Sequence, residues 1–228
     1  MKTLLLPWLL ALSATAAPIL PEASPQRAVS TTCPSYTIIN TRGTSEPQGP
    51  SAGFLTMNAL ITAQLPGGTI YNTVYPADAS QISTLGTLDI LREITSTLRA
   101  SPDECFLLQG YSQGAAATVN ALPRITGASF DAVKGVFLIG DPEHRGGLAC
   151  NVDNDGGTTT RDVSGLEALV TSGIPSNWVS KTLDVCIYGD GVCDTTHGVG
   201  ITPQHLEYPT DDDTQELGTL FGLAQLGA

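Results

Sequence analysis

Basic residues are scarce in this chain of 228 residues: Lys and Arg together number 10 against 22 Asp and Glu, and the formal net charge is -12. An acidic surface repels phosphates, so we expect no nucleic-acid partner. Long apolar runs are missing beyond the N-terminal region, so we expect no insertion into a membrane. This composition suits a neutral or apolar substrate.

The N-terminus has the pattern of a secretory signal peptide. Lys2 supplies the positive charge, residues 4–12 form a short apolar run, and Ala14-Thr15-Ala16 is typical of a cleavage site. We therefore expect a signal peptide over residues 1–16, a propeptide or disordered linker over 17–32, and one folded domain over 33–228. The mature protein is then secreted and extracellular.

Secretion makes the five cysteines candidates for disulfides. Cys33 precedes the first expected strand and Cys105 begins a later one, so a bridge between them would tie two neighbouring strands. Cys186 and Cys193 would enclose a tight loop. Cys150 is left over, and we expect a small buried residue there rather than a reactive thiol.

Strand and helix patterns alternate along the folded domain. Apolar runs predict strands at residues 35–40, 69–74, 105–109, 132–139 and 183–188. Helical periodicity predicts helices at residues 51–64, 83–99, 115–122 and 214–226, with a further helix possible at 164–171 in an otherwise loop-rich stretch. This alternation favours an α/β fold, a central parallel sheet with helices on both faces.

The stretch Gly110-Tyr111-Ser112-Gln113-Gly114 lies between an expected strand and an expected helix. This is the context of a nucleophile elbow, a sharp turn that presents a serine hydroxyl at its tip. A serine hydroxyl is a weak nucleophile at neutral pH and needs an adjacent base. Ser112 is therefore the candidate nucleophile.

Histidine is the usual base, and the chain has three. His205 lies between the last predicted strand and the closing helix, where the base of an α/β-hydrolase returns to the serine, so it is the first choice. His197 is the second choice. His144 stands beside Arg145 in a polar loop, and we expect it on the surface.

The acid that orients the base should follow the last strand. Asp190 does so, between Gly189 and Gly191 and inside the Cys186–Cys193 loop, with Asp194 as the alternative. The oxyanion needs two donors. One is the backbone N–H of Gln113, which follows the nucleophile. The second should come from the loop at 41–50, where the N–H or hydroxyl of Thr44 could serve.

Four motifs, in order, resemble the cutinase family of secreted fungal serine esterases. They are Thr41-Arg42-Gly43-Thr44-Ser45-Glu46, Gly110-Tyr111-Ser112-Gln113-Gly114, the paired cysteines around Gly189-Asp190-Gly191, and His205-Leu206-Glu207-Tyr208. The resemblance runs from about Cys33 to the C-terminus.

The resemblance implies a lidless α/β-hydrolase in which Ser112, Asp190 and His205 form the catalytic triad. It also implies an oxyanion hole of Thr44 and Gln113, and bridges that join Cys33 with Cys105 and Cys186 with Cys193. The family has an exposed, shallow, apolar cleft, and Ile201 and Leu206 are candidates for its wall, although either could equally be core. No cofactor is expected.

We therefore expect a monomeric esterase that cleaves cutin-like or aliphatic polyesters and short-to-medium acyl esters through an acyl-enzyme. An acetylxylan esterase is the alternative with the same chemistry. A non-catalytic secreted surface-binding protein is the alternative from another class.

One further motif loosely follows the spacing of a calcium-binding loop. It consists of Asn151, Asp153, Asp155 and, eleven residues after the first, Asp162. Because the usual final Glu is missing, we expect a polar turn and no metal at this position.

Overall fold

The computed structural model describes residues 33–227. The predicted signal peptide (1–16) and the predicted propeptide or linker (17–32) lie outside the described residues. Six strands form one sheet in the order β2-β1-β3-β4-β6-β5, and every pairing is parallel. The strands are β1 (Tyr36–Thr41), β2 (Gly68–Asn72), β3 (Cys105–Tyr111), β4 (Val133–Ile139), β5 (Asn151–Val152) and β6 (Thr182–Val185).

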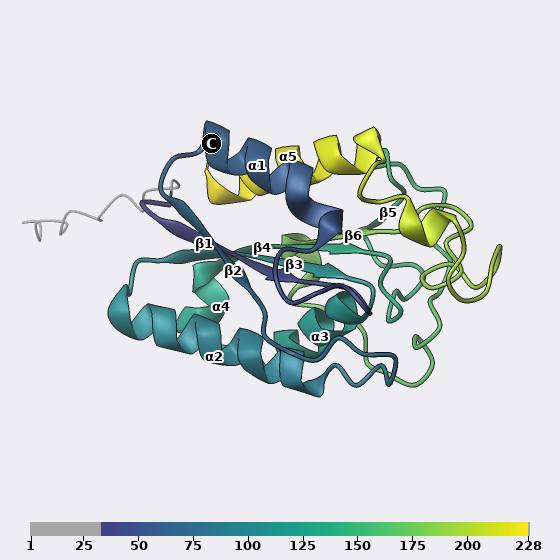
Figure 1. The fold of residues 1–228 in the computed structure, drawn as a ribbon, viewed down its shortest axis with the longest axis horizontal. Coiled ribbons are helices and arrows are strands. Elements are labelled where there is room, and N and C mark those ends of the chain that lie inside the picture. Colours follow the sequence, from purple (N-terminus) through teal and green to yellow (C-terminus); the bar gives the residue numbers. More distant parts are fainter. Residues whose placement is uncertain (1–32, 228) are drawn as a thin grey trace, which may run out of the picture. The chain divides into compact units, whose positions relative to one another are not determined.

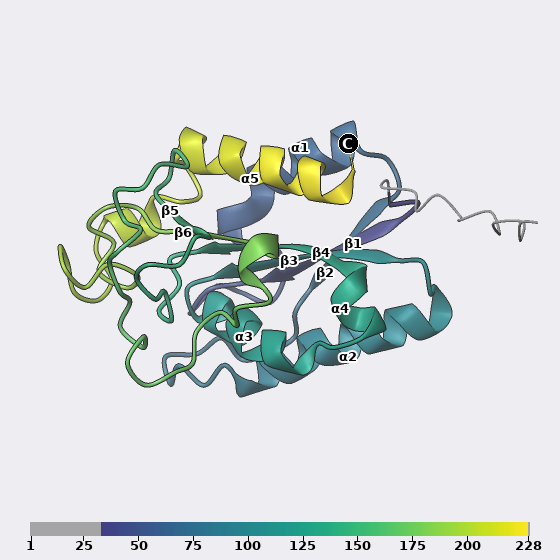
Figure 2. The same ribbon diagram turned by 180° about the vertical axis from the view of Figure 1, so that it is seen from behind.

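Helices cover both faces of this sheet, as the alternating pattern predicts. On one face lie α1 (Leu55–Gln64) and α5 (Asp212–Leu226), which are at the top of Figure 1. On the other lie α2 (Thr84–Ala100), α3 (Gln113–Ala121) and the short α4 (Ala128–Ala132), as Figure 2 shows from behind. The chain thus has the α/β-hydrolase architecture.

The strand before the predicted nucleophile lies at the centre of the sheet. β3 pairs with β1 on one side and β4 on the other, and all seven of its residues are buried. A central parallel strand covered on both faces is apolar along its whole length rather than alternating, which explains the run that begins at Cys105. Its carboxyl end carries the turn at Ser112.

The loop-rich stretch between β4 and β6 differs most from the expectation. The possible helix at 164–171 is absent, because these residues form turns. Main-chain N–H groups there donate to distant carbonyls instead: Leu166 N to Val192 O (2.9 Å) and Glu167 N to Pro142 O (2.7 Å). The two-residue strand β5 and the helix α4 are not anticipated by the sequence pattern.

Two disulfides are present and match the expected pairs. Cys33 joins Cys105, across the neighbouring strands β1 and β3, and Cys186 joins Cys193 just after β6. Cys150 is unpaired and buried. Among residues 33–227, no helix has the length and apolar character needed to cross a membrane.

Candidate active site

The turn between β3 and α3 holds Ser112 in a strained conformation. Its backbone has φ 54° and ψ -120°, which L-residues rarely adopt. The two glycines of the motif permit the close packing around it: a Cβ on Gly114 would lie 2.2 Å from the Thr41 carbonyl oxygen, and one on Gly110 would lie 2.6 Å from the Gly114 carbonyl oxygen. The sharp turn leaves the Ser112 side chain partly exposed.

The structure brings the predicted nucleophile, base and acid together. His205 Nε2 lies 2.9 Å from Ser112 Oγ, and His205 Nδ1 lies 2.9 and 3.0 Å from the two carboxylate oxygens of Asp190. A carboxylate only accepts, so Nδ1 carries the proton and Nε2 presents its lone pair to the serine. His205 comes from a short 3-10 turn (Gln204–Leu206), 93 residues after Ser112.

Asp190 is completely buried, and donors from two sides hold it in place. The Tyr208 hydroxyl donates to Oδ2 (2.6 Å), and the Val192 N–H donates to Oδ1 (2.9 Å). A second tyrosine fixes the base, since the Tyr111 hydroxyl donates to the His205 carbonyl (2.6 Å). Both tyrosines stand within motifs of the sequence, but nothing in its pattern reveals these contacts.

The two predicted oxyanion donors lie side by side. Gln113 is the first residue of α3, where backbone N–H groups have no partner within the helix. The Thr44 hydroxyl is 3.3 Å from the Gln113 side-chain oxygen and 3.2 Å from that of Gln81. This hydroxyl is therefore a donor next to the helix N-terminus, where the dipole favours negative charge.

A partly buried network of hydrogen bonds fixes the loop that carries Thr44. The Glu46 carboxylate accepts from the N–H of Gly43 (2.6 Å), the hydroxyl of Ser51 (2.8 Å) and the N–H of Ala52 (2.7 Å). Arg42 crosses to the next loop and donates to the Thr73 carbonyl (3.2 Å). The position of Thr44 is thus set before any substrate binds.

The other two histidines pair with different aspartates. His197 Nδ1 lies 2.8 Å from Asp194 Oδ2, so the second-choice base and the alternative acid form their own pair. The prediction that His144 lies on the surface is wrong: the residue is completely buried, and its Nδ1 lies 2.7 Å from Asp184 Oδ2. Its neighbours in sequence are polar, but its partner lies forty residues further along the chain.

The loop that leads to His205 exposes several large apolar side chains. Val199 and Tyr188 are exposed, and Ile201 and Leu206 expose 69% and 61% of their surface, so neither is core. We call these four the rim residues. Ile201 and Leu206 flank His205 in sequence, which suits the predicted cleft wall.

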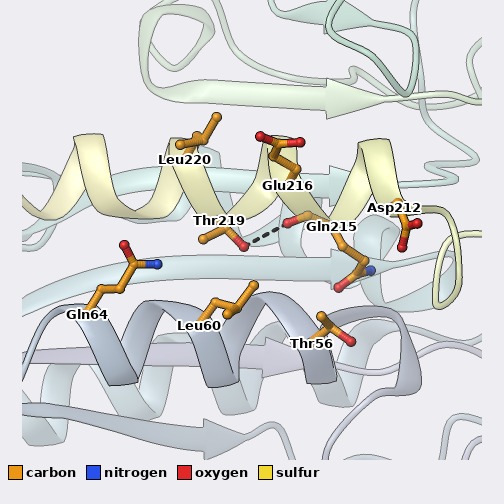
Figure 3. A pocket seen from close by; sticks show the side chains of 8 residues that line it. All are labelled: Thr56, Leu60, Gln64, Asp212, Gln215, Glu216, Thr219 and Leu220. Atoms are coloured by element: carbon orange, nitrogen blue, oxygen red, sulfur yellow. Dashed lines mark hydrogen bonds between the residues drawn. The ribbon is translucent and has the colours of Figure 1, made fainter.

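A hollow that is separate from these residues lies between α1 and α5. It encloses about 370 Å³ between Thr56, Leu60 and Gln64 of one helix and Asp212, Gln215, Glu216, Thr219 and Leu220 of the other (Figure 3). None of these residues belongs to the predicted triad or oxyanion hole. The Ser112 side chain is therefore not in this groove.

The calcium-like stretch folds as a turn closed by its own carboxylates. Asp153 accepts from the N–H groups of Gly157 (2.6 Å) and Thr159 (2.9 Å), and Asn151 donates to the Arg145 carbonyl (2.8 Å). Within residues 33–227, no group of three or more His, Cys, Asp or Glu side chains is placed to hold a metal.

Comparison with known proteins gives a consistent result. The sequence model of the Cutinase family matches residues 32–220. This chain belongs to the cutinase family. A solved structure of a cutinase-like protein from Cryptococcus sp. is 63% identical, with a TM-score of 0.85 over 88% of this chain and 99% of that one.

Two curated relatives are more distant members of the same group. An acetylxylan esterase of Hypocrea jecorina is 30% identical over 72% of this chain, which spans only 59% of that protein's length. A cutinase of Monilinia fructicola is 27% identical, with 78% of each chain covered. The family comprises carboxylic ester hydrolases of the serine esterase type.

Proposed function

We propose that this chain is a secreted serine esterase that hydrolyses cutin-like or aliphatic polyesters and short-to-medium acyl esters through an acyl-enzyme. Ser112 is the nucleophile, His205 the base and Asp190 the acid that orients it. One observation carries the proposal: Ser112, His205 and Asp190 are joined by hydrogen bonds of 2.9–3.0 Å at a strained elbow. Extracellular location is supported by the two disulfides.

Acylation begins when Ser112 Oγ attacks the ester carbonyl and its proton passes to His205 Nε2. The new imidazolium donates Nδ1–H to Asp190, whose buried carboxylate stabilises the charge. The oxyanion lies against the Gln113 N–H and the Thr44 hydroxyl. Collapse breaks the ester C–O bond, and His205 returns its proton to the departing alcohol.

Deacylation repeats these steps with water. His205 Nε2 takes a proton from water as the water oxygen attacks the acyl-serine carbonyl, and the same donors hold the second oxyanion. Collapse of this intermediate releases the carboxylic acid and returns the proton to Ser112. No cofactor takes part in either half of the reaction.

A polyester substrate is supported by the surface beside His205. The rim residues are apolar and exposed, so they can lie against a polymer chain that a closed pocket would exclude. The acidic charge of the protein is no obstacle, because an ester chain is neutral.

The proposal is tested with p-nitrophenyl esters from acetate to palmitate. We compare wild type with Ser112→Ala and with Ser96→Ala, a matched control that removes an exposed serine of α2. We expect Ser112→Ala to lose about 10⁶-fold in kcat, as when a catalytic serine is removed elsewhere, and Ser96→Ala to keep the wild-type rate. Equal rates for wild type and Ser112→Ala contradict the proposal and favour a non-catalytic binding protein.

A second candidate is deacetylation of a sugar polymer, favoured by the similarity to an acetylxylan esterase. The same ester series separates the two. A wild-type preference for butyrate or longer chains supports polyester hydrolysis, whereas a sharp preference for acetate supports the deacetylase.

A further inference from the structure

A buried group of three ionisable residues lies directly behind the proposed catalytic residues. Asp141 follows β4, His144 follows three residues later, and Asp184 is on β6; all three are completely buried. We call them the buried cluster. The proposed reaction uses none of them, and burying three such groups costs free energy unless their charges compensate one another.

The chain segment next to the cluster touches the catalytic residues. Gly140 has φ 57°, and a Cβ there would lie 2.8 Å from His205 Cε1 and 3.0 Å from Asp190 Oδ2. Ser112 N–H donates to the Ile139 carbonyl (3.0 Å), and Gly140 N–H donates to the Val185 carbonyl (3.1 Å). The main chain at 139–140 therefore packs directly against the side chains of His205 and Asp190 and bonds to the Ser112 backbone.

The buried cluster holds this segment from the other side. Asp141 begins a tight turn, since its carbonyl accepts from His144 N–H (3.1 Å) and its Oδ1 accepts from Glu143 N–H (3.0 Å). The His144 ring then reaches β6, with Nδ1 2.7 Å from Asp184 Oδ2, and Nε2 is 3.2 Å from the Thr160 carbonyl. The contact between His144 and Asp184 thus links the turn at 141–144 to β6, the strand that precedes Asp190.

The cluster holds protons within it. A carbonyl only accepts, so His144 Nε2 carries a hydrogen, and the short contact at Nδ1 requires a second proton between the ring and Asp184. Asp141 Oδ2 and Asp184 Oδ1 are buried without a hydrogen-bond partner among the described residues. His144 Nδ1 and Asp184 Oδ2 lie 2.7 Å apart as an ion pair, without the geometry of a hydrogen bond. With His144 protonated and Asp184 charged, the charges of the cluster compensate one another when Asp141 is also protonated.

Burial, and then the charge of Asp184, raise the pKa of Asp141 well above its ordinary value. Burial lowers the pKa of His144, but the charge of Asp184 and the bond to it outweigh burial and leave that pKa raised. Other ionisable groups face the cluster: the charges of Glu143 and Glu167 raise the pKa of Asp141, and the charge of Asp194 raises the pKa of His144. Burial raises the pKa of Glu143 to about 7, with Arg145 acting to lower it, and burial followed by the charge of Asp184 raises the pKa of the Cys150 thiol.

We propose that Asp141, His144 and Asp184 are positioning residues of this esterase, a proton-holding unit that keeps Gly140 against His205 and Asp190. The inference rests on the proposed function of Ser112, His205 and Asp190. None of the three touches the substrate, and they act through the main chain at 139–140.

The sign of the pH dependence follows from the raised pKa values. A group whose pKa is raised in the folded state contributes its full share of the folding stability at pH values below its ordinary pKa. That share is lost as the pH rises through the pKa that the group has in the folded state. Both Asp141 and His144 therefore keep their protons to a higher pH in the folded protein than in the unfolded chain, and they lose them as pH rises. Esterase activity should decline as these protons are lost.

The test compares Asp141→Asn, His144→Gln and the exposed control Asp103→Asn with wild type from pH 6 to 10. Rates use p-nitrophenyl butyrate and are corrected with Ser112→Ala. At pH 7 we expect kcat of Asp141→Asn to lie within threefold of the wild-type value. We expect its ratio of kcat at pH 9 to kcat at pH 7 to be at least threefold higher than the same ratio in wild type. The control should match wild type.

For His144→Gln we expect kcat at pH 7 to fall about tenfold with KM within twofold, because orientation is lost rather than binding. If His144→Gln does not fold, the pH ratio of Asp141→Asn alone tests the inference. An Asp141→Asn protein with native near-ultraviolet circular dichroism and the wild-type pH ratio overturns the inference, as does a wild-type kcat that is flat to pH 10.

Failure of the proposed function gives a different result. Wild type would then show no hydrolysis that depends on Ser112, whatever the pH. The role of the buried cluster is still tested by measuring Tm at pH 7 and pH 9. A smaller fall in Tm for Asp141→Asn than for wild type supports the inference, and an equal fall in Tm overturns it.

Discussion

The molecule contains two buried Asp–His pairs that have nearly the same contact distance and different surroundings. His205 Nδ1 lies 2.9 Å from Asp190, and His144 Nδ1 lies 2.7 Å from Asp184. The far nitrogen of His205 meets a partly exposed serine hydroxyl, whereas that of His144 meets the Thr160 carbonyl. His205 Nε2 can therefore accept a proton from the serine, whereas His144 Nε2 must carry a hydrogen that it donates to the carbonyl.

This difference shows that the atom beyond the imidazole decides what an Asp–His pair can do. Asp190 accepts hydrogen bonds from Tyr208 and Val192 as well as from His205, so its carboxylate is held in place for the proposed reaction. Asp184 Oδ1 has no hydrogen-bond partner within residues 33–227, and burial followed by the charge of Asp184 raises the pKa of Asp141. The His205–Asp190 pair can therefore transfer a proton, whereas the His144–Asp184 pair retains one.

The largest expected effect comes from Asp190→Asn. The amide can donate to His205 Nδ1 and so stabilise the wrong tautomer, which leaves Nε2 protonated and unable to accept from Ser112. We expect kcat to fall about 10⁴-fold, as in other serine hydrolases that lose this acid. Steady-state rates on p-nitrophenyl butyrate measure it, and a loss below tenfold would contradict the role given to Asp190.

Asp184→Asn should affect stability most. Removal of one partner of a buried ion pair leaves the other uncompensated, so we expect the free energy of unfolding to fall by about 3 kcal/mol. Urea titration at pH 7 measures this change, with Asp103→Asn as the exposed control. The two pairs would not differ as described if the stability of Asp184→Asn equalled that of wild type.

A smaller effect is expected from Tyr208→Phe, which removes little volume. It removes the hydrogen bond that the hydroxyl donates to Asp190 Oδ2 and the one that it accepts from the Ile187 N–H. Hydrogen bonds to a charged group contribute about 1.5–3 kcal/mol, so kcat should fall by at least about tenfold. Tyr36→Phe is the matched control, because that hydroxyl donates to the Leu65 carbonyl, away from the site. Equal kcat values for the two variants would show that Asp190 does not need this donor.

The motifs predicted much of this arrangement, since Ser112, Asp190 and His205 stand at fixed places relative to strands that apolar runs reveal. The surface prediction for His144 failed because local polarity says nothing of a partner on β6. The helix that was possible at 164–171 is absent for a related reason, as the N–H groups of Leu166 and Glu167 bond to residues 192 and 142. Contacts distant in sequence decide both cases, and single-sequence patterns do not contain them.

The most direct test of the account is labelling with a serine-directed organophosphate, followed by intact mass measurement and peptide mapping. We expect one label per chain, on Ser112, with labelling rates that fall strongly in Asp190→Asn and much less in Asp184→Asn. An unlabelled wild type, a label on another serine, or equal loss in the two variants would contradict the claim that only the His205–Asp190 pair activates a serine.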